Sequence, residues 1–274
     1  MFLQMMKKGI LLAGVFFLTL SCSEYQKVVK SQDAGLKYTT AEQLYNEAKE
    51  EDSNRKFKKA LRLFEQIVPQ FRGKPQGQKV SYLYADTYYQ LEDYYLASYQ
   101  FERFEQTYPD SEKAEEASYK KARSYYELSP RYFLDQADTE KAIVELQNYL
   151  NAYPDGEFAE EANKMVSELQ VKLEKKAYEI AKQYHHTEDY KAAIVSFDNF
   201  IADYPGSPFR EKALYYKFDS AYELAINSYR VLMEERLNTA HEYYKNYLKY
   251  FPQGEFQEQI EASDADIQTR LQNF

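Results

Sequence analysis

The chain has 274 residues, and its 35 Lys and Arg against 44 Asp and Glu give a formal net charge of −9. It is too long for one small core, and it lacks the excess of cations that a general nucleic-acid binder needs, so we expect no nucleic-acid partner. With only 8 Gly and 8 Pro, the chain has too few turn residues for a β-sandwich or barrel. The composition therefore favours an all-α fold.

Residues 1–21 have the organisation of a bacterial signal peptide. Lys7 and Lys8 precede an apolar run from Gly9 to Leu20, which is too short to cross a hydrocarbon core of about 30 Å as a helix. The run is therefore interpreted as a cleaved signal and not as a membrane span.

The end of this signal, Leu-Thr-Leu-Ser-Cys at residues 18–22, resembles the lipobox of bacterial lipoproteins, although Thr19 stands where leucine is usual. The resemblance implies that Cys22 becomes the acylated N-terminus and anchors the chain in a membrane. Ser23 after the cysteine favours the periplasmic face of the outer membrane. An ordinary secretory signal with a stray cysteine is the alternative. Residues 22–39 show no clear period, and we expect them to form a tether.

The residues of reactive chemistry are few. Cys22 is the only cysteine, so one chain can contain no disulfide, CxxC pair or cysteine-rich zinc site. The sequence has no HExxH motif and no glycine-rich phosphate-binding motif. Neighbouring side chains diverge on a helix, so we expect His185 and His186 to be a solvated pair and not metal ligands. We predict no catalytic residue, no enzyme activity, no metal and no cofactor besides the lipid on Cys22.

Residues 40–252 repeat one pattern five times. An alanine is followed after four and seven residues by a large apolar or aromatic residue, and after eleven residues by an aromatic one. These alanines are Ala60, Ala97, Ala142, Ala193 and Ala240. Offsets of 0, 4, 7 and 11 mark one face of a helix. In the last four copies a proline follows directly and ends the helix, namely Pro109, Pro154, Pro205 and Pro252.

A second helix with its own small residue precedes each of these alanines. The small residues are Ala48, Ala85, Ala122, Ala181 and Ala221. They lie 12 residues before the later alanine in repeats one, two and four, but 20 and 19 residues before it in repeats three and five. We therefore expect longer inter-helix loops within repeats three and five. Longer helices or loops are implied at 127–139, 157–176 and 226–239.

This organisation resembles the tetratricopeptide repeat, a helix–turn–helix unit with small residues at the helix crossing and a closing proline. The resemblance implies an all-α, right-handed helical-repeat solenoid. The repeats cover about 40–74, 75–110, 111–155, 156–206 and 207–252, and residues 253–274 are expected to form a capping helix. The spacings between successive alanines, 37, 45, 51 and 47 residues, exceed the usual 34 of this repeat.

An aromatic residue stands three positions before each first-helix small residue: Tyr45, Tyr82, Tyr119, Tyr178 and Phe218. In the tetratricopeptide pattern this position faces the groove, so these rings are candidates for a peptide-binding ladder. Polar and aromatic residues on the following turn extend the candidate groove: Lys49, Asp86, Tyr89, Arg123 and Tyr126. The alternative is that the rings fill gaps between repeats.

The closures Tyr-Pro-Asp-Ser, Tyr-Pro-Asp-Gly and Tyr-Pro-Gly-Ser at 108–111, 153–156 and 204–207, together with Tyr-Gln-Lys-Val-Val-Lys-Ser at 25–31, resemble the BamD family. These are tetratricopeptide lipoproteins of the outer-membrane β-barrel assembly machine. The resemblance implies a non-enzymatic scaffold. Its N-terminal repeats would receive the C-terminal signal of unfolded outer-membrane proteins, and its C-terminal repeats would hold the POTRA domains of the barrel subunit.

Segment 226–239 is our candidate for the contact with the POTRA-bearing partner. Other readings stay open. The chain could be another envelope lipoprotein with the same repeats, either a division or Tol-type coordinator or an activator of a peptidoglycan synthase. A solute- or glycan-binding lipoprotein is a further alternative, although its pocket would need larger insertions than 127–139 and 226–239.

Overall fold

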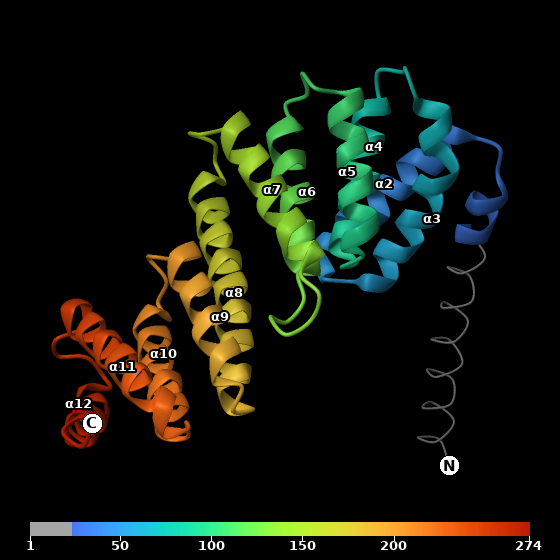
Figure 1. Cartoon of the computed structure of the whole chain (residues 1–274). Helices are drawn as coiled ribbons and strands as arrows, with labels where there is room; N and C mark the ends of the chain where they lie inside the picture. Colours follow the sequence, from blue (N-terminus) through green and yellow to red (C-terminus); the bar gives the residue numbers. More distant parts are fainter. Residues whose placement is uncertain (1–23) are drawn as a thin grey trace, which may run out of the picture. The chain divides into compact units, whose positions relative to one another are not determined.

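The computed structural model describes residues 24–274, which are almost entirely helical (Figure 1). Cys22 and the signal sequence lie outside the described residues. Within residues 24–274, no helix combines the length and the apolar character needed to cross a membrane.

The helices follow one another in antiparallel pairs, one pair for each repeat. These are α2 (Ala34–Glu51) with α3 (Asn54–Phe71), α4 (Gly77–Gln90) with α5 (Tyr94–Thr107), α6 (Ala114–Leu128) with α7 (Ala137–Ala152), α8 (Ala159–His186) with α9 (Tyr190–Asp203), and α10 (Arg210–Ile226) with α11 (Arg230–Tyr250). A final helix, α12 (Gln257–Leu271), packs on α11 and α10. The expected all-α helical-repeat fold is confirmed.

The described chain divides into two compact units. The first comprises residues 24–129 and 137–165, and the second comprises 130–136 and 166–274. The long helix α8 therefore contributes its first turns to one unit and the rest to the other. The loop segment 130–136 packs within the second unit, where Lys176 Nζ donates to the Leu134 carbonyl at 2.7 Å and Lys175 lies over the Tyr132 ring.

The core of each unit is built on the alanines of the repeat pattern. All the second-helix alanines and the first-helix alanines are buried, which lets the backbones of paired helices approach closely. On α5, for example, Ala97, Phe101 and Phe104 are buried on one face, and on α9 the matching residues Ala193, Phe197 and Phe200 are buried. The period of about 3.6 residues thus marks the buried faces, as the sequence predicts.

The closing prolines also act as expected. Helices α5, α9 and α11 each end two residues before the proline. The aromatic residue between helix end and proline caps the helix through its backbone N–H, as Tyr108 does to the Phe104 carbonyl at 2.8 Å and Phe251 to the Tyr247 carbonyl at 2.8 Å. Proline has no N–H with which to continue this series, so the helix stops.

The segment expected to be a tether is folded from residue 24 onward. Residues 24–30 form a short helix in which Val29 is buried, and the Tyr25 hydroxyl donates to the Lys59 carbonyl at 3.1 Å. Helix α2 then begins at Ala34, where the Asp33 side chain caps the helix by accepting from the N–H groups of Gly35 and Leu36. A helix of about two turns is too short to show a period in the sequence.

The added residues of the longer repeats take two forms. Repeat three contains the expected loop, at 129–136. In repeat five the expected longer inter-helix loop is wrong and the alternative of a longer helix at 226–239 holds, because the chain turns within 227–229 and the helix α11 begins at Arg230. The residues there, VLMEERL at 231–237, are mostly strong helix formers, so the insertion lengthens a helix. The added length at 157–176 likewise lies in helix α8, apart from its first two residues.

Candidate peptide-binding site

The first unit contains a cavity of about 450 Å³ between the first helices of three successive repeats. A volume of this size is typical of ligand pockets in proteins. The lining residues come from α2 (Tyr45, Lys49), from α4 and the turn before it (Pro75, Gln78, Lys79, Tyr82, Leu83), and from α6 and the turn before it (Glu112, Lys113, Glu116). Three of the residues expected to form a groove, Tyr45, Lys49 and Tyr82, therefore lie at this cavity.

Tyr45 and Tyr82 are mostly buried, and only a small part of each ring is exposed to the cavity. Tyr45 packs edge-on against Phe57, with ring centroids 5.8 Å apart, and Tyr82 packs edge-on against Phe104 at 5.6 Å. Burial raises the pKa of both hydroxyls, and the neighbouring Asp86 carboxylate raises it further. Both hydroxyls are therefore neutral and able to donate hydrogen bonds at physiological pH.

Beneath the cavity, a buried carboxylate joins three helices. Asp86 on α4 is fully buried, accepts a hydrogen bond from the Tyr45 hydroxyl of α2, and lies 2.5 Å from Lys120 Nζ of α6. Burial alone would lower the pKa of Lys120, but the Asp86 and Glu116 carboxylates outweigh this and raise it. Lys120 is thus charged, and the Asp86 carboxylate already has hydrogen-bond partners within the chain.

Three lysines and two glutamates line the cavity, so cations are in slight excess. Of the glutamates, Glu112 is exposed and forms no ion pair within the described residues. Lys49, Lys79 and Lys113 are exposed at the mouth of the cavity. Lys79 pairs with Glu42, and Lys113 lies 2.7 Å from Glu116. Lys49 lies over the Tyr45 ring, 5.8 Å from its centroid, and forms no ion pair with any residue of the described chain. An anionic group that approaches this mouth would meet an unpaired ammonium group beside an apolar floor.

Glu116 is the second of the two acidic residues that line the cavity. Burial alone would raise its pKa, but hydrogen bonds from Lys113, Lys120 and Tyr82 outweigh this and lower the pKa to about 2. It is therefore ionised at any physiological pH, and its charge is shared between Lys113 and Lys120, both 2.7 Å away.

The burial of the five candidate ladder rings favours the alternative, in which they fill the space between helices. Tyr45, Tyr82, Tyr119, Tyr178 and Phe218 are all at most 7% exposed and form part of the core. The reason is the spacing itself. Residues three apart share a helix face, and the alanine three positions later packs at a buried helix crossing. Tyr119, for example, stacks on Phe158 at 4.3 Å, and Tyr178 stacks on Phe209 at 5.3 Å.

The remaining expected groove residues do not line the cavity. Tyr89 is half-buried against Tyr94, and Tyr126 is half-buried on α6. Arg123 donates to the Tyr119 hydroxyl and to Glu161, both at 3.2 Å. These residues therefore serve contacts within the first unit.

Sequence reasoning missed Gln78, Lys79, Lys113 and Glu116 as cavity residues. A signal for them exists, because Lys79 and Glu116 stand three residues before Tyr82 and Tyr119 respectively. Residues three apart are neighbours on one face of a helix, so a residue three positions before a buried ring lies next to that ring, on the side nearer the helix N-terminus. Lys79 and Glu116, which line the cavity, therefore lie one helical turn before the buried rings Tyr82 and Tyr119.

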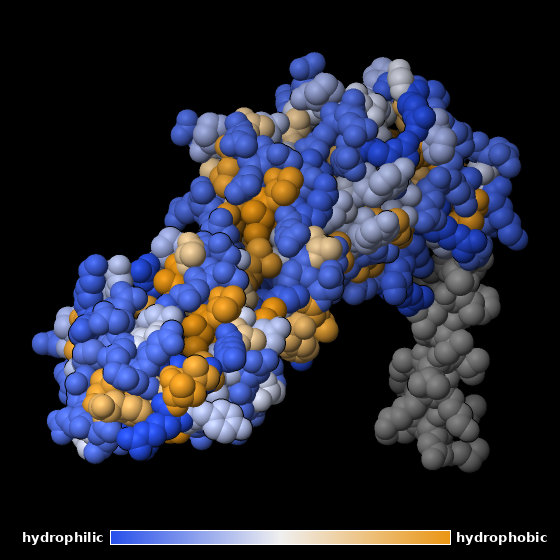
Figure 2. Space-filling model, in the orientation of Figure 1, coloured by the Kyte–Doolittle hydropathy of each residue, from blue (hydrophilic) through white to orange (hydrophobic). Residues whose placement is uncertain are grey.

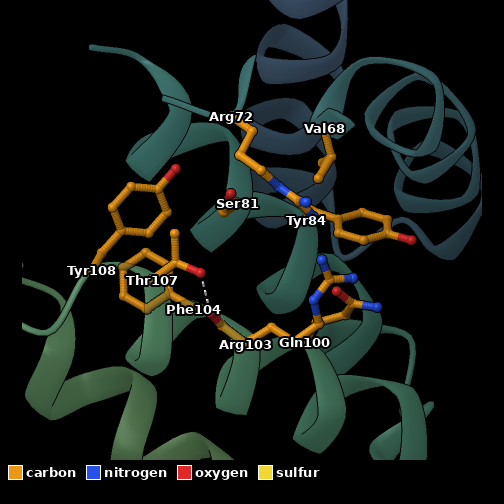
Figure 3. Close-up of a pocket in the computed structure, with 9 residues that line it drawn as sticks. All are labelled: Val68, Arg72, Ser81, Tyr84, Gln100, Arg103, Phe104, Thr107 and Tyr108. Carbon is orange, nitrogen blue, oxygen red and sulfur yellow. Dashed lines mark hydrogen bonds between the residues drawn. The ribbon is translucent and has the colours of Figure 1, made fainter. Parts of the chain in front are cut away.

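A second hollow of the first unit lies between α3, α4 and α5 (Figure 3). Arg72 and Arg103 point into it, together with Ser81 and Gln100. Its volume is only about 30 Å³, which is room for water and not for a peptide side chain. It is therefore not a candidate ligand site.

No group of three or more His, Cys, Asp or Glu residues within 24–274 has an arrangement that could hold a metal ion. His185 differs from the expected solvated pair. It is half-buried, with Nδ1 3.0 Å from Ser220 Oγ and Nε2 3.4 Å from Asp219. Burial lowers the pKa of this imidazole. Only His186 is exposed.

The sequence was compared with known proteins. The model of the YfiO family, described as outer membrane lipoprotein, matches residues 37–231 of the chain. No curated protein matches. Among solved structures, a de novo designed helical repeat protein covers 92% of this chain and 96% of its own chain at 17% identity, with a TM-score of 0.16. A score this low carries no argument, so the fold rests on the helices described above.

Proposed function

Because the chain belongs to the YfiO family of outer membrane lipoproteins, we propose that it is a non-enzymatic scaffold of the outer-membrane β-barrel protein assembly complex. In this proposal a lipid on Cys22 anchors it at the periplasmic face. Its partners are unfolded outer-membrane protein segments and the POTRA domains of the barrel subunit. The family match supports the outer membrane lipoprotein, and two surfaces of the chain support the two partners.

The cavity across α2, α4 and α6 carries the proposal for the unfolded segment. It combines apolar surface from Leu83 and the edges of Tyr45 and Tyr82 with ammonium groups at its mouth. The C-terminal end of an extended peptide with a final aromatic residue has the complementary chemistry. Its carboxylate would lie at Lys49 and Lys113, and its side chain would enter the apolar part.

Binding of a peptide with an aromatic C-terminal residue tests this assignment. Lys49→Glu places a negative charge at the mouth without breaking an ion pair, so we expect affinity to fall about tenfold, a charge effect of the size seen at partly exposed sites. The same peptide with a C-terminal amide should bind the unmodified protein about as weakly. Calorimetric titration measures both.

Lys191→Glu is the matched control, because Lys191 is an exposed lysine of the second unit. It should leave the affinity unchanged. Equal affinity for the carboxylate and the amide peptide would contradict the assignment. Tyr82→Ala with Tyr119→Ala, which the ladder suggests, is a poor test, since both rings belong to the core and their loss would destabilise the fold.

The second unit supplies the surface proposed for the POTRA domains. At the turn between α10 and α11, Tyr229 is 85% and Val231 is 86% exposed, and Leu232 is also exposed. Beside them a hollow of about 300 Å³ is lined by Met233 and Phe274 together with Arg230, Arg270 and Asn273. In Figure 2, hydrophobic residues are exposed over the α10–α11 region at the lower left. Exposed apolar residues that cluster in this way are typical of protein-binding surfaces.

A further inference from the structure

Four cations lie on one face of α3. Arg55, Lys58, Lys59 and Arg62 follow the spacing i, i+3, i+4 and i+7, which places them side by side along a helix. With Tyr25 they line an open hollow of about 460 Å³. Arg55, Lys58 and Arg62 are exposed, and Lys59 is half-buried. We call these four residues the basic face.

The basic face has no compensating carboxylates. Within residues 24–274, none of its four cations forms an ion pair, whereas Lys56 of the same helix pairs with Glu47 and Glu51. The stretch 53–64 contains five basic residues and no acidic one, in a chain whose net charge is −9. An unpaired cluster of this kind attracts an anionic surface.

The short N-terminal helix holds the start of the described chain against this face (Figure 1). The Tyr25 hydroxyl donates to the Lys59 carbonyl at 3.1 Å, and Lys59 Nζ lies 5.1 Å from the centroid of the Tyr25 ring. Val29 of the same helix is buried in the core of the first unit. Lys27 and Lys30 are exposed on this helix and add two more cations.

Tyr25 is three residues beyond Cys22. Three residues span at most about 11 Å, whatever conformation they adopt. A lipid chain on Cys22 would therefore keep Tyr25 within about 11 Å of the point where the chain enters the bilayer surface. The basic face adjoins Tyr25, with Lys59 Nζ 5.1 Å from its ring, so it would lie near the bilayer as well. This step rests on the lipid anchor of the proposed function.

We propose that the basic face binds the anionic headgroups of the bilayer in which the Cys22 lipid is inserted, and so sets the orientation of the first unit on the membrane. The short reach from Cys22 selects the membrane as partner over an acidic protein. Each Lys or Arg close to an anionic bilayer strengthens association about fivefold at physiological ionic strength. The lipid alone would hold the chain at the surface without fixing which side faces it.

Partition into lipid vesicles tests the proposal apart from the anchor. The mature chain from residue 22, with Cys22→Ser, is mixed with vesicles of phosphatidylcholine alone or with about a third of phosphatidylglycerol. We expect binding to the anionic vesicles only. Replacing Arg55, Lys58, Lys59 and Arg62 with Gln should weaken that binding by about fivefold for each cation, or several hundredfold in all.

The matched control replaces Lys191, Lys212, Lys245 and Lys249 of the second unit with Gln, which changes the net charge equally. It should retain binding. Equal losses of vesicle binding in the two variants would overturn the proposal, because binding would then depend on the net charge and not on the position of the cations. Binding of poly-glutamate but not of anionic vesicles would also overturn it and assign the face to an acidic protein.

A second measurement uses the acylated protein in vesicles. With Cys22 blocked by its lipid, Lys58→Cys and Lys191→Cys each introduce one reactive thiol. A membrane-impermeant maleimide should react more slowly at position 58 than at position 191 on anionic vesicles, but equally on neutral ones. Equal rates on both would contradict the proposed orientation. Failure of the anchor itself is distinguished by the mass of the mature protein, which shows whether Cys22 is acylated.

Discussion

Asp86 is fully buried, and its carboxylate accepts hydrogen bonds from Tyr45 of the first repeat, from Gln90 of the second and from Lys120 of the third. Removing one member of a buried charged pair leaves the other unpaired and costs about 3–5 kcal/mol. The network therefore holds three repeats in one register. Its place beneath the cavity means that the shape of the cavity depends on these buried contacts.

Glu116 makes the stability of the first unit depend on pH. Its pKa in the folded chain is about 2, below the ordinary value of 4.5. The folded state therefore binds the proton less readily than the unfolded state, so this stability is present above pH 4.5 and is lost as the pH falls toward 2. We expect Glu116→Gln to flatten this acid limb. Urea unfolding at a series of pH values measures it.

Glu112→Gln serves as the comparison, because Glu112 is exposed and forms no ion pair within the described residues. It should leave the acid limb as steep as in the unmodified protein. If both variants gave the same pH profile, the hydrogen bonds from Lys113, Lys120 and Tyr82 would not hold Glu116 ionised.

At the scale of elements, repeats three and five close with the same arrangement of groups. In repeat three the Tyr149 hydroxyl donates to Glu115 of the first helix at 3.1 Å and accepts from the Phe158 N–H at 3.1 Å. In repeat five Tyr247 donates to Glu211 at 2.8 Å and accepts from the Phe256 N–H at 3.2 Å. Each arrangement connects both helices of a repeat to the next turn.

In each of these two repeats a glycine lets the tyrosine hydroxyl and the glutamate carboxylate lie close to the backbone of the turn. A Cβ at Gly156 would collide with the Glu115 carboxylate and lie 2.8 Å from the Tyr149 hydroxyl, and one at Gly254 would collide with Glu211 and Tyr247. We expect Gly156→Ala or Gly254→Ala to lower the free energy of unfolding by about 1–3 kcal/mol, as overpacking does. Thermal and urea unfolding measure the change.

Gly206 stands at the corresponding turn of repeat four, where a Cβ would meet no heavy atom within 4 Å. Gly206→Ala should therefore leave stability unchanged or raise it by a few tenths of a kcal/mol through the unfolded chain. A loss as large as that of Gly156→Ala would show that the cost comes from backbone conformation and not from the close contact.

At the scale of the whole molecule, the two units offer different surfaces. The first contains the cavity lined by Lys49, Lys79 and Lys113 and the basic face, and the second contains the apolar surface at Tyr229 and Val231. Changes at distant sites without shared partners have nearly independent effects. The two proposed partners should therefore be separable by mutation.

Purification of the tagged lipoprotein from crosslinked envelopes tests this separation. We expect a POTRA-bearing β-barrel protein in near-stoichiometric amount. The variant with Tyr229→Ser and Val231→Ser should lose most of the POTRA-bearing protein, because the exposed apolar contact is removed. The Lys49→Glu variant should recover the POTRA-bearing protein as the unmodified chain does, although its affinity for the C-terminal peptide is reduced. Mass spectrometry of the recovered proteins gives the amounts.

Val195→Ser is the control, since Val195 is a 59% exposed apolar residue elsewhere in the second unit. Recovery of the POTRA protein at the unmodified level with Tyr229→Ser and Val231→Ser would refute the assigned surface. A division protein or a cell-wall synthase in place of the POTRA protein would refute the assembly function and leave the fold unaffected.

The sequence by itself determined the repeats, because their signals are local. The buried alanines and rings recur with the helical period, and the prolines remove the N–H that the next turn needs, as at Pro109 and Pro252. Each signal lies within about twelve residues, so no knowledge of distant contacts is required to read it.

The tertiary structure decided which side chains remain accessible. Tyr45 lies beside Asp86, which is 41 residues later, and Asp86 lies beside Lys120, which is 34 residues later. These contacts bury the tyrosine ladder and leave Lys49, Lys79 and Lys113 at the mouth of the cavity. Burial depends on the packing of the neighbouring repeat, and a period along one helix carries no information about how far that neighbour covers it.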